Sequence, residues 1–181
     1  MSSQAGPVEF LPLGAIIQSF TVGGVNIALG YPSEEIYRKT GNKTFFGETI
    51  GRVANRISAA KIDSLNGKSY ELEANEAGKN NLHGGSNGWG KATWEGPTPV
   101  NRNGREEVMF KHISKDGDAG FPGTVEAKVY YAVSKAKKGI EGVNLDWEYE
   151  IELVGDEVEE TVVNVTNHGY ICIRVPLPSS C

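Results

Sequence analysis

The clearest pattern along the chain is a strict alternation of apolar and acidic residues at positions 145–153, with the sequence LDWEYEIEL. Every odd position is apolar and every even position is acidic, which predicts a strand with one buried and one solvated face. Further strands are predicted at residues 108–112 and 126–133. Residues 161–167 form another predicted strand, in which Val163 and Val165 share one face.

A β-hairpin is predicted where residues 61–64 and 69–72 flank the segment LNGK. Asn66 and Gly67 lie at its centre, and both residue types tolerate the positive φ angles of a type I′ turn. The two flanking segments are therefore expected to pair in the antiparallel sense.

Turn-forming residues are frequent, since the 181 residues include 23 glycines and 8 prolines, and no convincing helical period is visible. Short strands separated by turns are typical of an antiparallel all-β sandwich or barrel. The length fits one domain with a sizeable core, and no repeat or linker divides it. We therefore expect an all-β fold.

The charge balance narrows the class of partner. Lysine and arginine number 18 against 23 acidic residues, a net charge of −5, and no basic stripe is present. Neither nucleic acid nor a membrane surface is therefore an expected partner. The sequence has no apolar run of roughly 18 residues and no signal peptide, which favours the cytoplasm. Both cysteines, Cys172 and Cys181, fall in the last ten residues and predict no metal site.

Two of the three histidines lie in polar settings: His83 in NNLHGG and His168 in NVTNH. Imidazole titrates near neutral pH, so two of them in one pocket would suit proton transfer on an uncharged polar substrate. The glycines after His83 would allow close approach of backbone to a ligand. His112 alternates with apolar neighbours and is predicted to face solvent.

The segment GRVANRI at 51–57 offers several fixed hydrogen-bond donors. These donors, on Arg52, Arg56 and Asn55, could form hydrogen bonds with sugar hydroxyls or carboxylates. Alternatively, the two arginines could be a surface pair or form a structural salt bridge. Tryptophans such as Trp89 are more often core residues than ligand platforms, but Trp89 lies between two glycines and could stack on a sugar ring. Residues 116–123 lack the ligand spacing of a calcium loop and predict a tight turn.

Together these segments resemble the aldose 1-epimerases (galactose mutarotases), over roughly residues 10–170. The resemblance is carried, in the family's order, by FFG at 45–47, GRVANRI at 51–57, NGKSYEL at 66–72, NLHGG at 81–85, GW at 88–89, Trp94, DG at 116–117, GFPG at 120–123 and VNVTNH at 163–168. Each motif is weak alone, but the ordered set is specific.

The resemblance implies an antiparallel β-sandwich of the galactose mutarotase-like supersandwich type, with a sugar cleft on one sheet and no metal or organic cofactor. It implies interconversion of the α and β anomers of a free hexose such as galactose or glucose. By motif, His168 corresponds to the general acid at the ring oxygen and His83 to a second histidine bonding near that oxygen. Asn55 and Arg56 correspond to sugar-hydroxyl contacts, whereas Arg52 is assigned a structural role.

The sequence departs from the family pattern after Tyr170. We expect residues 1–170 to be the N-terminal part of the sandwich and residues 171–181 an aberrant tail, as in a truncated product. The family's second half carries a sugar-binding Asp and the general-base Glu, and Glu48 is a poor stand-in for that base. An incomplete sandwich would leave strand edges unpaired, which favours association with another chain.

Hexose mutarotase is therefore the predicted function. This polypeptide alone is expected to be inactive if nothing replaces the general-base Glu of the family's second half. The main alternative is a non-catalytic sugar-binding or regulatory module that keeps Asn55, Arg56 and His83 as contacts. A non-functional fragment and a phosphosugar epimerase are further readings. The phosphosugar reading is disfavoured because no basic cluster beyond Arg52 and Arg56 could hold a phosphate.

Overall fold

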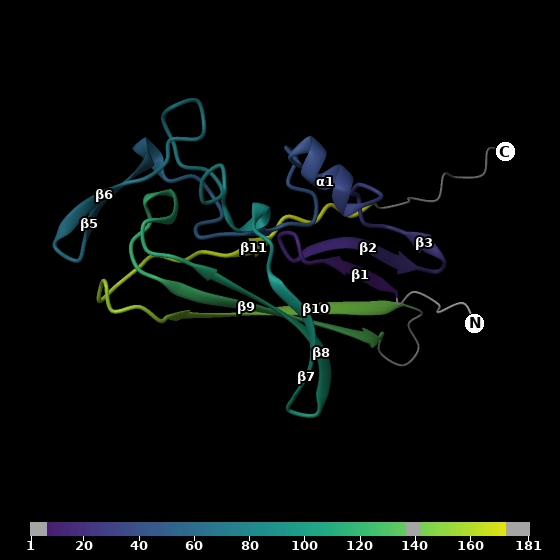
Figure 1. The fold of residues 1–181 in the computed structure, drawn as a ribbon. Helices are drawn as coiled ribbons and strands as arrows, with labels where there is room; N and C mark the ends of the chain where they lie inside the picture. Colours follow the sequence, from purple (N-terminus) through teal and green to yellow (C-terminus); the bar gives the residue numbers. More distant parts are fainter. Residues whose placement is uncertain (1–6, 137–141, 173–181) are drawn as a thin grey trace.

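The computed structural model describes residues 7–136 and 142–172, and it shows a mostly antiparallel β-structure in two layers (Figure 1). A four-stranded sheet with the order β10-β9-β8-β7 is the larger layer. Its strands are β7 (Glu95–Arg102), β8 (Arg105–Ser114), β9 (Val125–Lys135) and β10 (Val143–Leu153). This confirms the expected all-β class and the strands predicted around residues 108–112, 126–133 and 145–153.

The second layer is a small three-stranded sheet that lies against the larger one, with the only α-helix of the described residues on its outer side (Figure 1). Its elements are β1 (Val8–Leu11), β2 (Ile16–Val22), β3 (Val25–Asn26) and α1 (Glu34–Thr40). Gly41 ends the helix in the left-handed conformation, with φ of 67°. The sequence did not predict this helix, because seven residues are too few to establish a 3.6-residue period.

The core forms where the inward faces of these two layers meet. Phe10 of β1 stacks on Tyr131 of β9 with ring centroids 4.5 Å apart, and the Tyr131 hydroxyl donates to the Ala15 carbonyl at 2.9 Å. Phe110 and Val129, which are paired across β8 and β9, are fully buried. Apolar side chains at alternate positions of three strands thus close one face of the sheet.

Shorter pairings complete the fold around the sheet. They comprise β4 (Thr49–Ile50) with β11 (Thr166–Asn167), and β5 (Lys61–Leu65) with β6 (Lys68–Glu71). Single 3₁₀ turns are η1 (Ser58–Ala60), η2 (Trp89–Lys91) and η3 (Asp118–Gly120). In the β5–β6 hairpin the turn residues Asn66 and Gly67 have φ of 50° and 72°, which confirms the predicted type I′ turn.

The strand predicted at residues 161–167 is largely wrong, because only Thr166–Asn167 pair as β11. Asn164 forms a single parallel bridge to Val53, and the segment between Leu153 and β11 is otherwise extended without a ladder. The tail predicted at 171–181 is described only at Ile171 and Cys172, and the rest of it lies outside the described residues. Among the residues described, no helix is long and apolar enough to span a membrane.

Candidate functional site

Backbone pairing places His168 beside β4. The His168 N–H donates to the Glu48 carbonyl at 2.8 Å, and the Gly47 N–H donates to the His168 carbonyl at 3.2 Å. The Asn167 side-chain amide also donates to the Gly47 carbonyl at 2.9 Å. The position of His168 therefore depends on the 47–50 segment, more than 100 residues earlier in the chain.

His83 is placed by a loop that lies directly on the GRVANRI segment. Asn81 and Ile57 exchange backbone hydrogen bonds of 2.8 and 3.1 Å. Gly84 has φ of 77°, and a Cβ there would lie 2.0 Å from the Gly51 carbonyl oxygen. The close approach expected after His83 is thus at least in part an approach to the chain's own backbone, which only glycine permits.

The two histidine rings lie next to each other, half-buried, with centroids 5.2 Å apart and planes at 82°. The ring of Phe45 contacts both, at 4.6 Å from His83 and 5.6 Å from His168. The Tyr170 ring also lies near His168, with centroids 5.4 Å apart. The fold therefore brings together two imidazole rings, side chains that can donate or accept protons, against aromatic neighbours.

The hydrogen bonding of His83 defines its tautomer. Its Nδ1 is in hydrogen-bond contact with the Ala54 carbonyl oxygen, which can only accept, so Nδ1 carries a hydrogen. Burial lowers the pKa of His83, and the nearby His168, Arg56 and Lys91 act in the same direction, against the bond to Ala54. At pH 7 the ring is therefore neutral, and its Nε2 is a hydrogen-bond acceptor.

Arg56 and Asn55 lie at the exposed side of the same segment. The Arg56 Nε donates to both carboxylate oxygens of Glu76, at 2.7 and 2.8 Å, and this pairing lowers the pKa of Glu76. The Asn55 side-chain oxygen accepts the Arg56 N–H at 2.8 Å. Both side chains are accessible to a ligand, and Glu76 holds the guanidinium in a fixed orientation.

Arg52 lies in the interior and has a structural environment. It is 1% exposed and donates to the carbonyl of Pro122 at 2.6 Å and to the hydroxyl of Ser114 at 2.8 Å. Burial lowers its pKa to about 10. These bonds tie the GRVANRI segment to the loop between β8 and β9, so Arg52 cannot contact a ligand at the histidine pair without breaking them.

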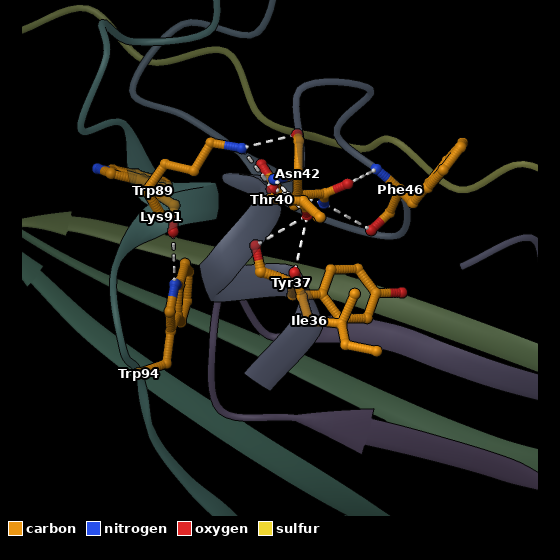
Figure 2. Close-up of polar contacts among 9 residues, drawn as sticks. Ile36, Tyr37, Thr40, Asn42, Phe46, Trp89, Lys91 and Trp94 are labelled. Atoms are coloured by element: carbon orange, nitrogen blue, oxygen red, sulfur yellow. Dashed lines mark hydrogen bonds and ion pairs between the residues drawn. The ribbon is translucent and has the colours of Figure 1, made fainter. Parts of the chain in front are cut away.

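Glu48 is also buried and is not available as a base. Its carboxylate is 1% exposed, and its Oε1 accepts from Asn42 Nδ2 at 2.7 Å and from Lys91 Nζ at 2.6 Å. Figure 2 shows how Lys91 and Asn42 approach each other in this cluster. Burial raises the pKa of Glu48, although Lys91 acts against the rise.

One further sequence expectation is wrong, and for Trp89 the structure favours the core reading over stacking on a sugar. His112 does not face solvent but lies half-buried, 5.3 Å from Trp94 and 6.0 Å from Trp89 between ring centroids. It shares the inward face of β8 with Phe110 and Ser114, which are 0% and 2% exposed. Trp89 is 3% exposed and packs in the core, where its carbonyl accepts the Trp94 indole N–H at 3.0 Å (Figure 2).

The sequence alone does not predict a role at the histidine pair for Phe45, Tyr170, Glu76 or Lys91. Phe45 belongs to a family motif, and that motif could have indicated a role for it. Glu76 and Lys91 belong to none of the motifs and come close to the histidine pair only in the folded chain. In the described parts of the chain, no group of three or more His, Cys, Asp or Glu side chains is placed to hold a metal ion.

Comparison with known proteins gives consistent matches. The family model for aldose 1-epimerase matches residues 2–176. The bifunctional protein GAL10 of Pachysolen tannophilus is 40% identical over 160 residues, covering 87% of this chain and 22% of that protein. The galactose mutarotase of Bos taurus is 36% identical over 146 residues, covering 80% of this chain and 36% of that protein.

Among solved structures, a GalM/aldose epimerase homologue from C. elegans superposes with a TM-score of 0.68 at 25% identity, covering 92% of this chain and 47% of that one. The galactose 1-epimerase of Lactobacillus acidophilus superposes with a TM-score of 0.67 at 23% identity, with 94% and 47% covered. The chain thus spans about half the length of these structures, and a smaller part of the curated relatives.

Proposed function

The chain belongs to the aldose 1-epimerase family, and from this membership we propose that it binds a free hexose at the histidine pair and interconverts its α and β anomers. The observation that carries the proposal is the contact between His83 and His168, with ring centroids 5.2 Å apart. The residue roles and the substrate are our proposals, because the chain spans 36% of the galactose mutarotase of Bos taurus.

The reaction needs one acid and one base, and its atoms balance without a cofactor. His168 donates a proton to the ring oxygen of the sugar as the bond from C1 to that oxygen breaks. A base accepts the proton of the C1 hydroxyl, and the electron pair left on that oxygen forms the aldehyde. After rotation about C1–C2 the hydroxyl oxygen of C5 attacks the other face of the aldehyde, and both protons return.

His83 takes the accepting role in this scheme. Its Nδ1 hydrogen is used by the Ala54 carbonyl, so the neutral ring can only accept through Nε2 and cannot donate to a ring oxygen. A sugar hydroxyl is the complementary partner. Because burial lowers its pKa, His83 is a weaker base than an exposed imidazole, and we expect slower exchange than an exposed imidazole base would support.

Galactose exchange by NMR saturation transfer tests the proposal. We expect the purified chain to exchange α and β anomers faster than buffer alone, and His168→Ala to abolish the excess, since general acid catalysis contributes about 10²–10⁴-fold. His112→Phe is the matched control, because it removes a histidine from the core and leaves the pair intact.

The outcome separates the two functions considered. Exchange that is lost in His168→Ala and retained in His112→Phe supports the mutarotase. A galactose-dependent change in tryptophan fluorescence without exchange would instead identify a sugar-binding module, with Asn55 and Arg56 as contacts. Neither exchange nor binding, in a chain that melts cooperatively, would overturn the proposal.

A further inference from the structure

Lys91 is held in one position by groups from a different part of the chain. Its Nζ donates to the buried Glu48 carboxylate at 2.6 Å and to the Asn42 carbonyl at 3.0 Å. The Lys91 side chain is 25% exposed and the Glu48 side chain 1% exposed, so this ion pair is largely removed from solvent. A buried ion pair often contributes little net stability, because desolvation of the two charges offsets their attraction. A role other than stability is therefore worth considering for this pair.

Asn42 and Glu48 also bracket the loop that carries Phe45. Asn42 accepts the Phe46 N–H through its side-chain oxygen at 3.1 Å and the Phe45 N–H through its carbonyl at 2.8 Å (Figure 2 shows the contact with Phe46). Phe45 has φ of 56°, which is rare for an aromatic residue and persists only where the surroundings impose it. The loop therefore holds the backbone that carries the Phe45 ring.

The Lys91 ammonium lies over this ring, 4.4 Å from its centroid. The same ring contacts His83 and His168, so an unbroken series of contacts joins the buried Glu48–Lys91 pair to both imidazoles. We propose that Lys91 is a positioning residue of the histidine pair, anchored by Glu48 and Asn42 and acting on the imidazoles through Phe45 and through its charge.

The charge of Lys91 disfavours protonation of His83. The groups facing His83 are His168, Arg56 and Lys91, which disfavour its protonation, and Glu76, which is neutralised in part by Arg56. Removing the Lys91 charge therefore makes His83 easier to protonate. Removing the Glu48 charge leaves Lys91 uncompensated and has the opposite effect.

NMR titration of the histidine C2 protons in the whole chain tests this inference. We expect the midpoint of His83 to move to higher pH in Lys91→Met and to lower pH in Glu48→Gln. Lys135→Met, at the exposed end of β9, is the matched control and should leave the midpoint unchanged. Galactose exchange in Lys91→Met should fall less than on loss of His168, because the loss of positioning is opposed by a more basic His83.

A double variant guards against misfolding, because Lys91→Met alone leaves a buried carboxylate without its partner. Lys91→Met with Glu48→Gln removes both charges and should still raise the His83 midpoint. A folded double variant with an unchanged midpoint would overturn the inference. The exchange readout alone rests on the proposed function: a shifted midpoint in a chain that exchanges no sugar would refute the function and leave the role of Lys91 intact.

Discussion

Arg52 and Arg56 lie four residues apart in the same segment but have opposite environments. Arg52 is 1% exposed and joins the loop that contains Pro122, whereas the Arg56 side chain is 55% exposed and pairs with Glu76. The first holds the fold together and the second is free to meet a ligand. The two arginines differ in exposure because the β8–β9 loop covers the Arg52 side of the segment and leaves the Arg56 side open to solvent.

We therefore expect Arg52→Ala to lower the free energy of unfolding by about 3 kcal/mol or more, because it leaves several buried acceptors unpaired. Arg56→Ala should leave the unfolding free energy nearly unchanged, since an exposed ion pair contributes little. Urea unfolding of the two variants measures both. Equal losses in the two would contradict this assignment of roles.

The histidines make stability sensitive to acid. Burial lowers the pKa of both His83 and His112 below the usual 6.5, so the unfolded chain binds more protons than the folded one in the window just below that pH. Unfolding free energy should therefore fall as pH drops below about 6.5.

His112→Phe isolates one of these contributions. Phenylalanine keeps an aromatic ring against Trp89 and Trp94 but cannot be protonated, so the variant should lose less stability than the parent chain between pH 7 and pH 5. Urea unfolding at the two pH values measures the difference. The same fall in both proteins would show that His112 is not a source of the acid sensitivity.

How far single residues could be predicted depended on where their partners lie in the chain. The family motifs singled out His83 and His168, which the structure brings together. Local sequence could not reveal that His112 faces inward, because alternation leaves the choice of face open when polar and apolar residues mix. Lys91 carried no signal, since its partners at 42 and 48 are more than 40 residues away.

At the scale of elements, η2 fits against the 42–48 loop only because its central residue is glycine. A Cβ on Gly90 would lie 2.1 Å from Oε2 of Glu48 and 2.8 Å from its carboxyl carbon. The turn can therefore bring Lys91 to the carboxylate without a clash. This glycine is needed for close approach and not for a positive φ.

Gly90→Ala should consequently lower the free energy of unfolding by about 1–3 kcal/mol, as overpacking does. Gly142→Ala is the control, because its nearest contact would be an ordinary 3.5 Å to the Ala136 Cβ. Thermal melts of both variants give the comparison. An unchanged melting temperature in Gly90→Ala would mean that Glu48 can move aside at little cost.

Elements with a strict local period were predictable, and those defined by distant partners were not. Strand β10 and the β5–β6 hairpin follow directly from alternation and from an Asn-Gly turn. Residues 161–167 have strand-like composition, yet two of them form a ladder, because the neighbouring 52–54 segment offers a single bridge. Sequence alone does not say whether an extended segment finds a partner.

At the scale of the whole molecule, the described chain exposes apolar surface on a strand at the edge of the larger sheet. Strand β10 is an edge of its sheet, and Trp147 on it is 47% exposed. Trp147 lines an apolar pocket of about 180 Å³ with Leu29 and Ile171, which are 44% and 53% exposed. Edge strands with apolar side chains favour pairing with another chain, although the acidic residues of β10 oppose it.

We therefore expect the chain to self-associate as its concentration rises, and Trp147→Lys to shift the balance toward monomer by placing a charge at the centre of this surface. Trp147→Phe keeps the surface apolar and is the matched control. Sedimentation velocity over a range of concentrations measures both variants. If the parent chain and Trp147→Lys associate to the same extent, the contact lies elsewhere, and the acidic face of β10 is sufficient to protect its edge.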